Sequence, residues 1–96
     1  MKKSLLLVLT LGAVLSAADG AALYKKCAAC HGAGGEKHAL GKSKVINTMT
    51  PAQIETALNG YKDGTYGGSM KALMKGQAAP LSDEEIKAIA AFIGTK

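Results

Sequence analysis

The residues best suited to chemistry lie in one short segment, Cys27-Ala28-Ala29-Cys30-His31. The C-x-x-C-H spacing is the attachment signature of a c-type haem. On a helix, positions i, i+3 and i+4 lie on one face, so Cys27, Cys30 and His31 can meet one flat ligand. The two thiols would add to the porphyrin vinyl groups as thioethers, and the imidazole would bind the iron as an axial ligand. The motif therefore predicts a chain that carries one covalent haem and one electron.

A thiol oxidoreductase or a zinc site is the alternative use of these cysteines. A thioredoxin-like motif belongs in a βαβ context, which this sequence does not suggest. A zinc site needs four ligands, and this segment offers Cys27, Cys30, His31 and His38 in a cramped run. A disulfide between such close cysteines would add little stability. A haem would instead supply a large apolar plate to a thin core, so we favour the haem.

The element expected to position the motif is a helix. Asp19 is a suitable N-cap, and the residues after it favour helix, so we predict a first helix from about Gly20 into Cys27. Several glycines follow His31 directly and are expected to end it. A short apolar patch further along is expected to line the cofactor pocket; it consists of Val45, Ile46 and Met49.

Two helices are predicted in the middle of the chain. A capping box, with Thr50 at the N-cap and Gln53 at N3, begins the second helix, and Gly60 is expected to stop it. A short third helix is predicted over residues 70–75, with Ser69 as its cap and with its end between Gly76 and Pro80.

A second capping box begins the last predicted helix. Ser82 is its N-cap and Glu85 its N3 residue, and the apolar stripe that follows has the 3.6-residue period as far as Ile93. Gly94 is expected to end it. No stretch alternates as a strand does, so we predict an all-α domain whose long loops wrap a ligand.

The start of the chain has the features of a secretory signal peptide. Lys2 and Lys3 precede an apolar run, and small residues follow it. We expect residues 1–17 to be removed by cleavage after Ala17 or Ala18, which would place the protein in the periplasm. An uncleaved membrane anchor is the alternative, but the apolar run is short for a span.

The charge of the chain narrows its class of partner. The 96 residues carry a formal net charge of +5, and removing Lys2 and Lys3 lowers this to +3. All basic side chains are lysines, whereas a nucleic-acid binder more often uses arginine. A modest lysine excess suits steering toward an acidic protein partner, and an ordinary solvated surface is the plainer interpretation.

The ligand on the far side of the iron decides the function. An open site would bind gas or support catalysis, whereas a methionine ligand suits electron transfer. The candidates in this sequence are His38, Met49, Met70 and Met74. Met70 and Met74 are one helical turn apart and share a face, so their spacing does not choose between them.

The sequence resembles the class I c-type cytochromes, and within them the small bacterial cytochrome c-553 group. Four segments carry this resemblance in order: D-G-A-A-L-Y-K-K-C at 19–27, G-Y-K-D-G-T-Y-G-G at 60–68, K-A-L-M at 71–74 and S-D-E-E at 82–85. Together with the C-x-x-C-H motif they cover nearly the whole mature chain.

The resemblance implies a class I cytochrome c fold over residues 18–96. It implies thioether bonds at Cys27 and Cys30, and axial ligation of the iron by His31 and Met74. It further implies that Tyr61 and Tyr66 lie beside the haem edge or its propionates. It also implies that the first and last helices cross. The crossing is expected near Gly20 and Tyr24 on the first helix and near Ile89 and Phe92 on the last.

The function that follows is that of a monomeric, periplasmic, one-electron carrier rather than an enzyme. Expected partners are a periplasmic dehydrogenase or hydrogenase and a terminal oxidase or reductase, with no nucleic acid and no stable membrane insertion. The electron would leave through the haem edge near the cysteines. Candidate residues for a basic docking rim are Lys25, Lys26, Lys37, Lys42, Lys71 and Lys75.

Overall fold

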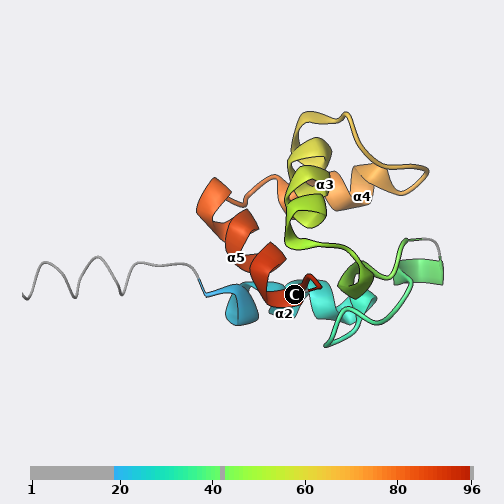
Figure 1. Ribbon diagram of the computed structural model, residues 1–96. Coiled ribbons are helices and arrows are strands. Elements are labelled where there is room, and N and C mark those ends of the chain that lie inside the picture. Colours follow the sequence, from blue (N-terminus) through green and yellow to red (C-terminus); the bar gives the residue numbers. More distant parts are fainter. Residues whose placement is uncertain (1–18, 42, 96) are drawn as a thin grey trace, which may run out of the picture.

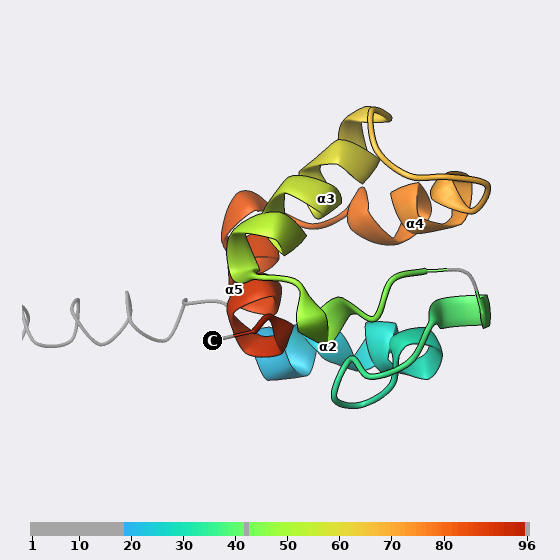
Figure 2. The same ribbon diagram turned by 45° about the vertical axis from the view of Figure 1, so that its right-hand side comes forward.

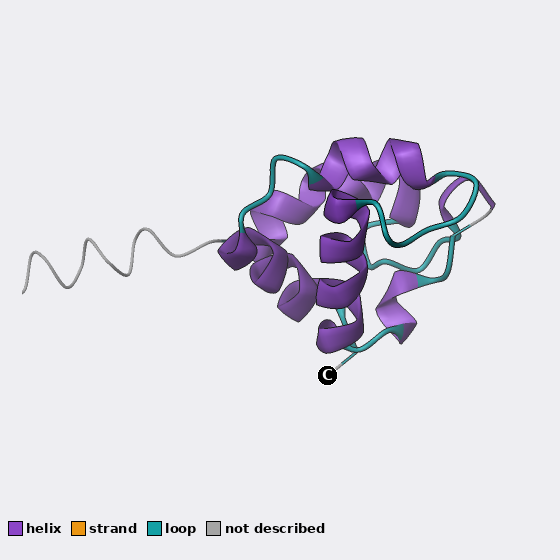
Figure 3. Ribbon diagram, turned by 90° about the horizontal axis from the view of Figure 1, so that it is seen from above, coloured by secondary structure: helices purple, strands orange, loops and turns teal. Residues whose placement is uncertain are grey.

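The computed structural model describes residues 19–41 and 43–95, so the expected signal peptide and its cleavage site lie outside the described residues. The described part contains the helices α2 (Gly20–His31), α3 (Pro51–Asp63), α4 (Lys71–Ala78) and α5 (Asp83–Ile93), and short 3-10 turns at Ala39–Gly41 and Ile46–Thr48. Figure 3 shows helices and loops but no strand in this part of the chain. The all-α prediction is confirmed. None of the helices from residue 19 onward has the length and apolar character needed to span a bilayer.

The predicted starts of α2, α3 and α5 are confirmed by their hydrogen bonds. The Asp19 carboxylate accepts from the backbone N–H groups at positions 21 and 22, at 3.1 and 3.3 Å. The Thr50 hydroxyl accepts from the Gln53 N–H at 3.1 Å, and the Gln53 side chain accepts from the Thr50 N–H at 2.9 Å. Ser82 and Glu85 form the same reciprocal pair before α5. Each cap satisfies N–H groups that have no partner within their helix.

The α2 helix extends one turn past Cys27 and ends at His31, with Gly32 as its C-cap. The whole C-x-x-C-H motif is therefore helical. A helix is needed if its three functional side chains are to face one ligand from the same side. The predicted end of α5 is also confirmed, because Gly94 is its C-cap.

The prediction that Gly60 stops the second helix is wrong, because α3 continues to Asp63 and ends at Gly64. Gly60 is buried, and a Cβ atom placed on it would lie 2.5 Å from the Cβ of Tyr66. This glycine therefore serves close packing of the following loop against α3.

The prediction for the third helix is wrong at its start. Its N-cap is Met70, which makes no side-chain capping hydrogen bond, so Ser69 does not cap it. The helix extends past residue 75 and ends at Ala78, which lies between Gly76 and Pro80 as predicted.

The helices surround the middle of the molecule from three sides. Figures 1 and 2 show α2 on one side, α3 and α4 on the opposite side, and α5 connecting them at one flank. The α5 helix packs against both α2 and α3, and α3 packs against α4. The buried cluster at these contacts consists of Tyr24, Ile54, Leu81, Ile86, Ile89, Ala90 and Ile93.

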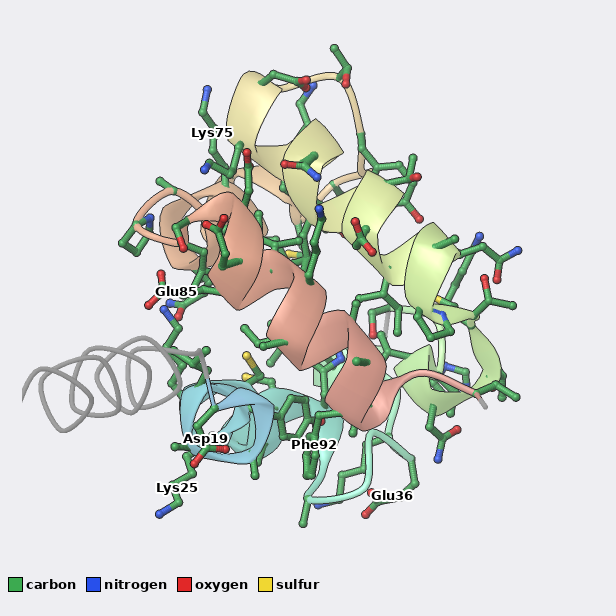
Figure 4. All side chains as sticks on the ribbon, turned by 60° about the vertical axis from the view of Figure 1, so that its left-hand side comes forward. Asp19, Lys25, Glu36, Lys75, Glu85 and Phe92 are labelled. Atoms are coloured by element: carbon green, nitrogen blue, oxygen red, sulfur yellow. The ribbon has the colours of Figure 1, made fainter. Side chains whose placement is uncertain are left out.

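The crossing of α2 and α5 lies where the resemblance implies it. A Cβ atom on Gly20 would lie 2.9 Å from the Cβ of Phe92 and would also overlap the backbone of Ala88. The rings of Tyr24 and Phe92 pack with centroids 5.8 Å apart. Figure 4 shows Phe92 at the junction of the two helices. The absence of a side chain at position 20 lets the backbones approach closely.

We predict opposite effects for two glycine-to-alanine changes. Gly20→Ala should lower the free energy of unfolding of the haem-loaded protein by about 1–3 kcal/mol, because its Cβ forces the α2–α5 crossing apart. Gly76→Ala should raise it by about 0.5–1 kcal/mol, because the added Cβ meets no atom within 4 Å apart from its chain neighbours and the backbone of its own helix, and alanine is the better helix former. Denaturant unfolding measures both. Equal effects would contradict the close crossing.

Candidate haem site

The three motif residues differ in exposure along the C-terminal half of α2. His31 is 6% exposed, Cys27 is half-buried and Cys30 is exposed. The two cysteines are not joined in a disulfide. Both thiols are therefore free to react with a ligand lying against α2.

Two cavities open beside the motif, with volumes of about 210 and 390 Å³. They adjoin, since they share Cys27, His31, Ser43, Tyr61, Gly68 and Met74. The first lies at the cysteine end, where Cys30, Lys26 and Leu73 also line it. The second extends into the apolar interior, where Ile54, Ala57, Leu58, Ile89 and Ile93 line it. Together they form a long space with thiols at one end and hydrocarbon at the other.

The His31 imidazole is held in a state suited to metal binding. Burial lowers its pKa, so the ring stays neutral at neutral pH and keeps a lone pair for a metal. Its Nδ1 atom is buried and has no hydrogen-bond partner among the described residues. A buried ring nitrogen without a partner is costly for folding alone and is typical of a site built for a ligand.

The pKa of the Cys27 thiol is shifted in the opposite direction from that of a redox-active cysteine. Burial is the main cause that raises its pKa, although the neighbouring Lys26 ammonium opposes the shift. A protonated thiol is a weak nucleophile in disulfide exchange. This environment fits a cysteine used once, for covalent attachment, better than a catalytic thiolate.

The Tyr24 side chain supports the end of the motif helix. Its hydroxyl donates a 2.6 Å hydrogen bond to the Gly32 carbonyl, and the ring lines the second cavity. Burial first, and then the charges of Cys27 and Glu36, raise the pKa of Tyr24 to about 12. The phenol therefore remains a donor at neutral pH and fixes the chain just after His31.

The four candidates for the opposite ligand are placed differently. Met74 lines both cavities, Met70 lines the first and Met49 lines the second. His38 lines neither; its ring is exposed, and its Nδ1 atom lies 2.7 Å from the Ser43 carbonyl oxygen. Of the four candidates, Met74 alone lines both of the cavities that His31 lines, although it comes from α4 on the other side of the space.

The two tyrosines implied to flank the haem lie together. Tyr61 and Tyr66 pack edge to face with ring centroids 5.1 Å apart, and both line the second cavity. Burial is the main cause that raises the pKa of Tyr61, and Tyr66 adds to it. Of the predicted apolar patch, Ile46 and Met49 line this cavity and Val45 does not.

Sequence reasoning missed two exposed leucines at the mouth of the first cavity. Leu40 is 59% exposed and Leu73 is 47% exposed, and both line that cavity. Leu40 also has a left-handed backbone, with φ of 54°, which is uncommon outside glycine. The sequence does show Leu40 as a large apolar residue within the polar run 36–44. Because this run has no periodic pattern, the sequence did not predict where the Leu40 side chain would lie.

These residues fit a covalently attached haem. Two thiols and an imidazole lie on one helix, a methionine lies across the space, and apolar side chains line the interior. The chain matches the Cytochrome c family over residues 17–96. It therefore belongs to the cytochrome c family of electron-transfer proteins, which carry haem c, and the thiol and zinc alternatives are set aside.

Within that family the chain is similar to cytochromes c-553. It is 49% identical to "Cytochrome c-553" of Helicobacter pylori strain 26695, across 92% of this chain and 88% of that protein. It is 42% identical to "Cytochrome c-553" of Nitratidesulfovibrio vulgaris, across 95% and 96%. A third such protein, from Desulfomicrobium norvegicum, is 40% identical across 79% and 94%. The resemblance stated from the four sequence segments is confirmed.

We predict that Tyr24 makes stability fall at alkaline pH. The folded state raises the pKa of Tyr24 from 10.0 to about 12, so its protonated phenol contributes fully below pH 10 and this contribution is lost as the pH rises through 12. In Tyr24→Phe this part of the decline should be absent. The variant should also be about 1 kcal/mol less stable at pH 7, because the Gly32 carbonyl loses its donor. Denaturant unfolding at a series of pH values measures both effects, and parallel curves for the two proteins would contradict the assignment.

Proposed function

We propose that this protein is a periplasmic, monohaem, one-electron carrier whose iron is held by His31 and Met74. Cys27 and Cys30 would hold the porphyrin through two thioether bonds. The observation that carries the proposal is that Cys27, His31 and Met74 line the same two adjoining cavities, although they come from α2 and α4. An imidazole and a thioether that face one space suit the two axial ligands of a six-coordinate haem, and the thiol beside them suits covalent attachment of the porphyrin.

When bound, the haem supplies an iron that takes up and releases one electron. The chain supplies the surroundings that make this exchange easy. His31 presents a neutral ring because burial lowers its pKa, and Met74 presents a neutral sulfur, so neither ligand needs to gain or lose a proton. The apolar lining of the second cavity keeps water away, so little solvent has to reorganise.

Export before function is the second part of the proposal. Residues 1–17 would be removed, after Ala17 or Ala18, and residues 18–96 would form the mature cytochrome c domain. The positive start, the apolar run and the small residues of the sequence support this, and haem c attachment through a C-x-x-C-H motif is consistent with an exported protein.

The mouth of the first cavity is the proposed exit for the electron. Leu40 and Leu73 are exposed there, and Lys26 and Lys71 lie beside them. Lys75 follows Lys71 by one turn of α4, and Figure 4 shows it extending outward. Apolar contact surrounded by ammonium groups suits brief docking of an acidic protein.

The other residues of the proposed docking rim have weaker support. Lys25 and Lys37 are exposed but line neither cavity, and Lys42 lies outside the described residues. We propose a periplasmic dehydrogenase or hydrogenase as electron donor and a terminal oxidase or reductase as acceptor, with the cytochrome acting as a monomer.

The ligand assignment predicts different spectra for two methionine variants. Met74→Ala should lose the Met–iron charge-transfer band of the oxidised protein, and its reduced form should bind carbon monoxide readily, because one coordination position opens. Met70→Ala should keep the band, since Met70 lines only the first cavity. Absorption spectra of the three proteins decide the matter. Loss of the band in Met70→Ala alone would reverse the assignment.

The docking proposal predicts a charge effect confined to the cavity mouth. Lys71→Gln should slow oxidation of the reduced protein by anionic ferricyanide more than Lys87→Gln does, because Lys71 lines the first cavity and Lys87 lies on α5 outside both cavities. Both variants change the net charge equally. Added salt should slow the wild-type reaction by screening. Stopped-flow kinetics measure these rates, and salt-independent rates or equal slowing would contradict the proposed surface.

A further inference from the structure

A lysine of the motif helix is hydrogen-bonded to the methionine helix across the cavity mouth. Lys26 Nζ, on α2, donates to the backbone carbonyl of Gln77, on α4, at 3.2 Å. Extensive packing joins α2 to α5 and α3 to α4, but not α2 to α4. Within residues 19–41 and 43–95 this is the side-chain hydrogen bond that links the two helices directly.

The acceptor is a carbonyl that needs a partner. Gln77 lies in the last turn of α4, where carbonyl groups have no N–H of their own helix to accept from, and where the helix dipole favours a cation. A second lysine acts close by, because Lys62 Nζ of α3 donates to the Leu81 carbonyl at 2.6 Å. Thus Lys26 holds the last turn of α4 itself, and Lys62 holds the short connection between α4 and α5.

The opposite end of α4 is held less firmly. Its N-cap, Met70, makes no side-chain capping bond, and the glycine-containing loop 64–69 precedes it. The position of α4 over the cavity therefore depends strongly on its C-terminal attachments. One of these, to Lys26, reaches across to the helix that carries the haem-binding motif.

The attachment acts on the face of α4 that carries the proposed ligand. Met74 and Gln77 are three positions apart on the helix, so they lie on one side of it, and both line the first cavity together with Lys26. Lys26 directly precedes Cys27 in the chain. A bond at this place sets the distance between the Met74 side of the space and the His31 side.

We propose that Lys26 is a positioning residue, whose hydrogen bond to the Gln77 carbonyl holds α4 against α2 and thereby keeps Met74 on the iron. The inference rests on the proposed ligation by Met74. Without the bond, α4 keeps its contacts with α3 but moves away from α2 more often, and an external ligand then displaces the methionine more easily.

The test is a titration of the oxidised, haem-loaded protein with imidazole, which competes with the axial methionine. Lys26→Leu should bind imidazole about three- to tenfold more tightly than wild type, the factor expected from losing one ordinary hydrogen bond. Lys26→Arg should stay near wild type, because it keeps a charged donor. The readout is loss of the Met–iron charge-transfer band as imidazole is added.

Lys25→Leu is the matched control. Lys25 neighbours Lys26 on α2, and replacing it with leucine removes the same charge from the protein. Figure 4 shows the Lys25 side chain pointing away from the rest of the molecule. Its imidazole affinity should equal that of wild type. Equal shifts in Lys25→Leu and Lys26→Leu would show a general charge effect and overturn the proposal, as would an unchanged affinity in Lys26→Leu.

Failure of the proposed ligand gives a different result. If Met74→Ala kept the charge-transfer band, Met74 would not be the ligand, whatever the lysine variants did. If Met74→Ala lost the band while Lys26→Leu matched Lys25→Leu, ligation by Met74 would stand and only the positioning role would fall. Helix content of each variant, measured by circular dichroism, shows that the compared proteins are folded.

Discussion

The close crossing of α2 and α5 is the contact on which the rest of the structure depends. Because Gly20 brings the two backbones together, α2 has a fixed direction, and its C-terminal half faces the cavities. Tyr24 then packs on Phe92 and donates to Gly32, which fixes the chain just beyond His31. The haem-binding motif is thus oriented by contacts made one and two turns earlier, outside the motif itself.

Local signals in the sequence predicted the local features well. Side-chain caps depend on residues three positions apart, so Thr50 and Ser82 could be recognised directly. The wrong predictions came from residues whose role is tertiary. Gly60 reads as a helix stop, but it is a glycine because Tyr66 lies against it, and nothing near it in the sequence shows that contact. Ser69 reads as a cap, but the chain enters α4 one residue later.

Sequence reasoning could address only one side of the proposed site. C-x-x-C-H is a contiguous pattern whose chemistry follows from helical spacing, so Cys27, Cys30 and His31 could be named from the sequence. The opposite side depends on how α4 lies across the space. Met70 and Met74 are equivalent by spacing, and the structure distinguishes them only in that Met74 lines both cavities whereas Met70 lines the first. Hydrogen bonds from lysine to distant carbonyls leave no sequence signal at all, because any residue offers a carbonyl.

The contact at Gly20 also limits how this chain can evolve. A larger residue at position 20 would meet the carbonyl group and backbone of Ala88, and every residue at position 88 has the same backbone. No substitution at position 88 can therefore relieve the clash, as it could if side chains met there. Relief would require moving the whole of α5, which also lines the second cavity through Ile89 and Ile93. Two packed side chains can usually change together during evolution, one becoming larger as the other becomes smaller. Such a paired substitution with residue 88 is not possible at position 20.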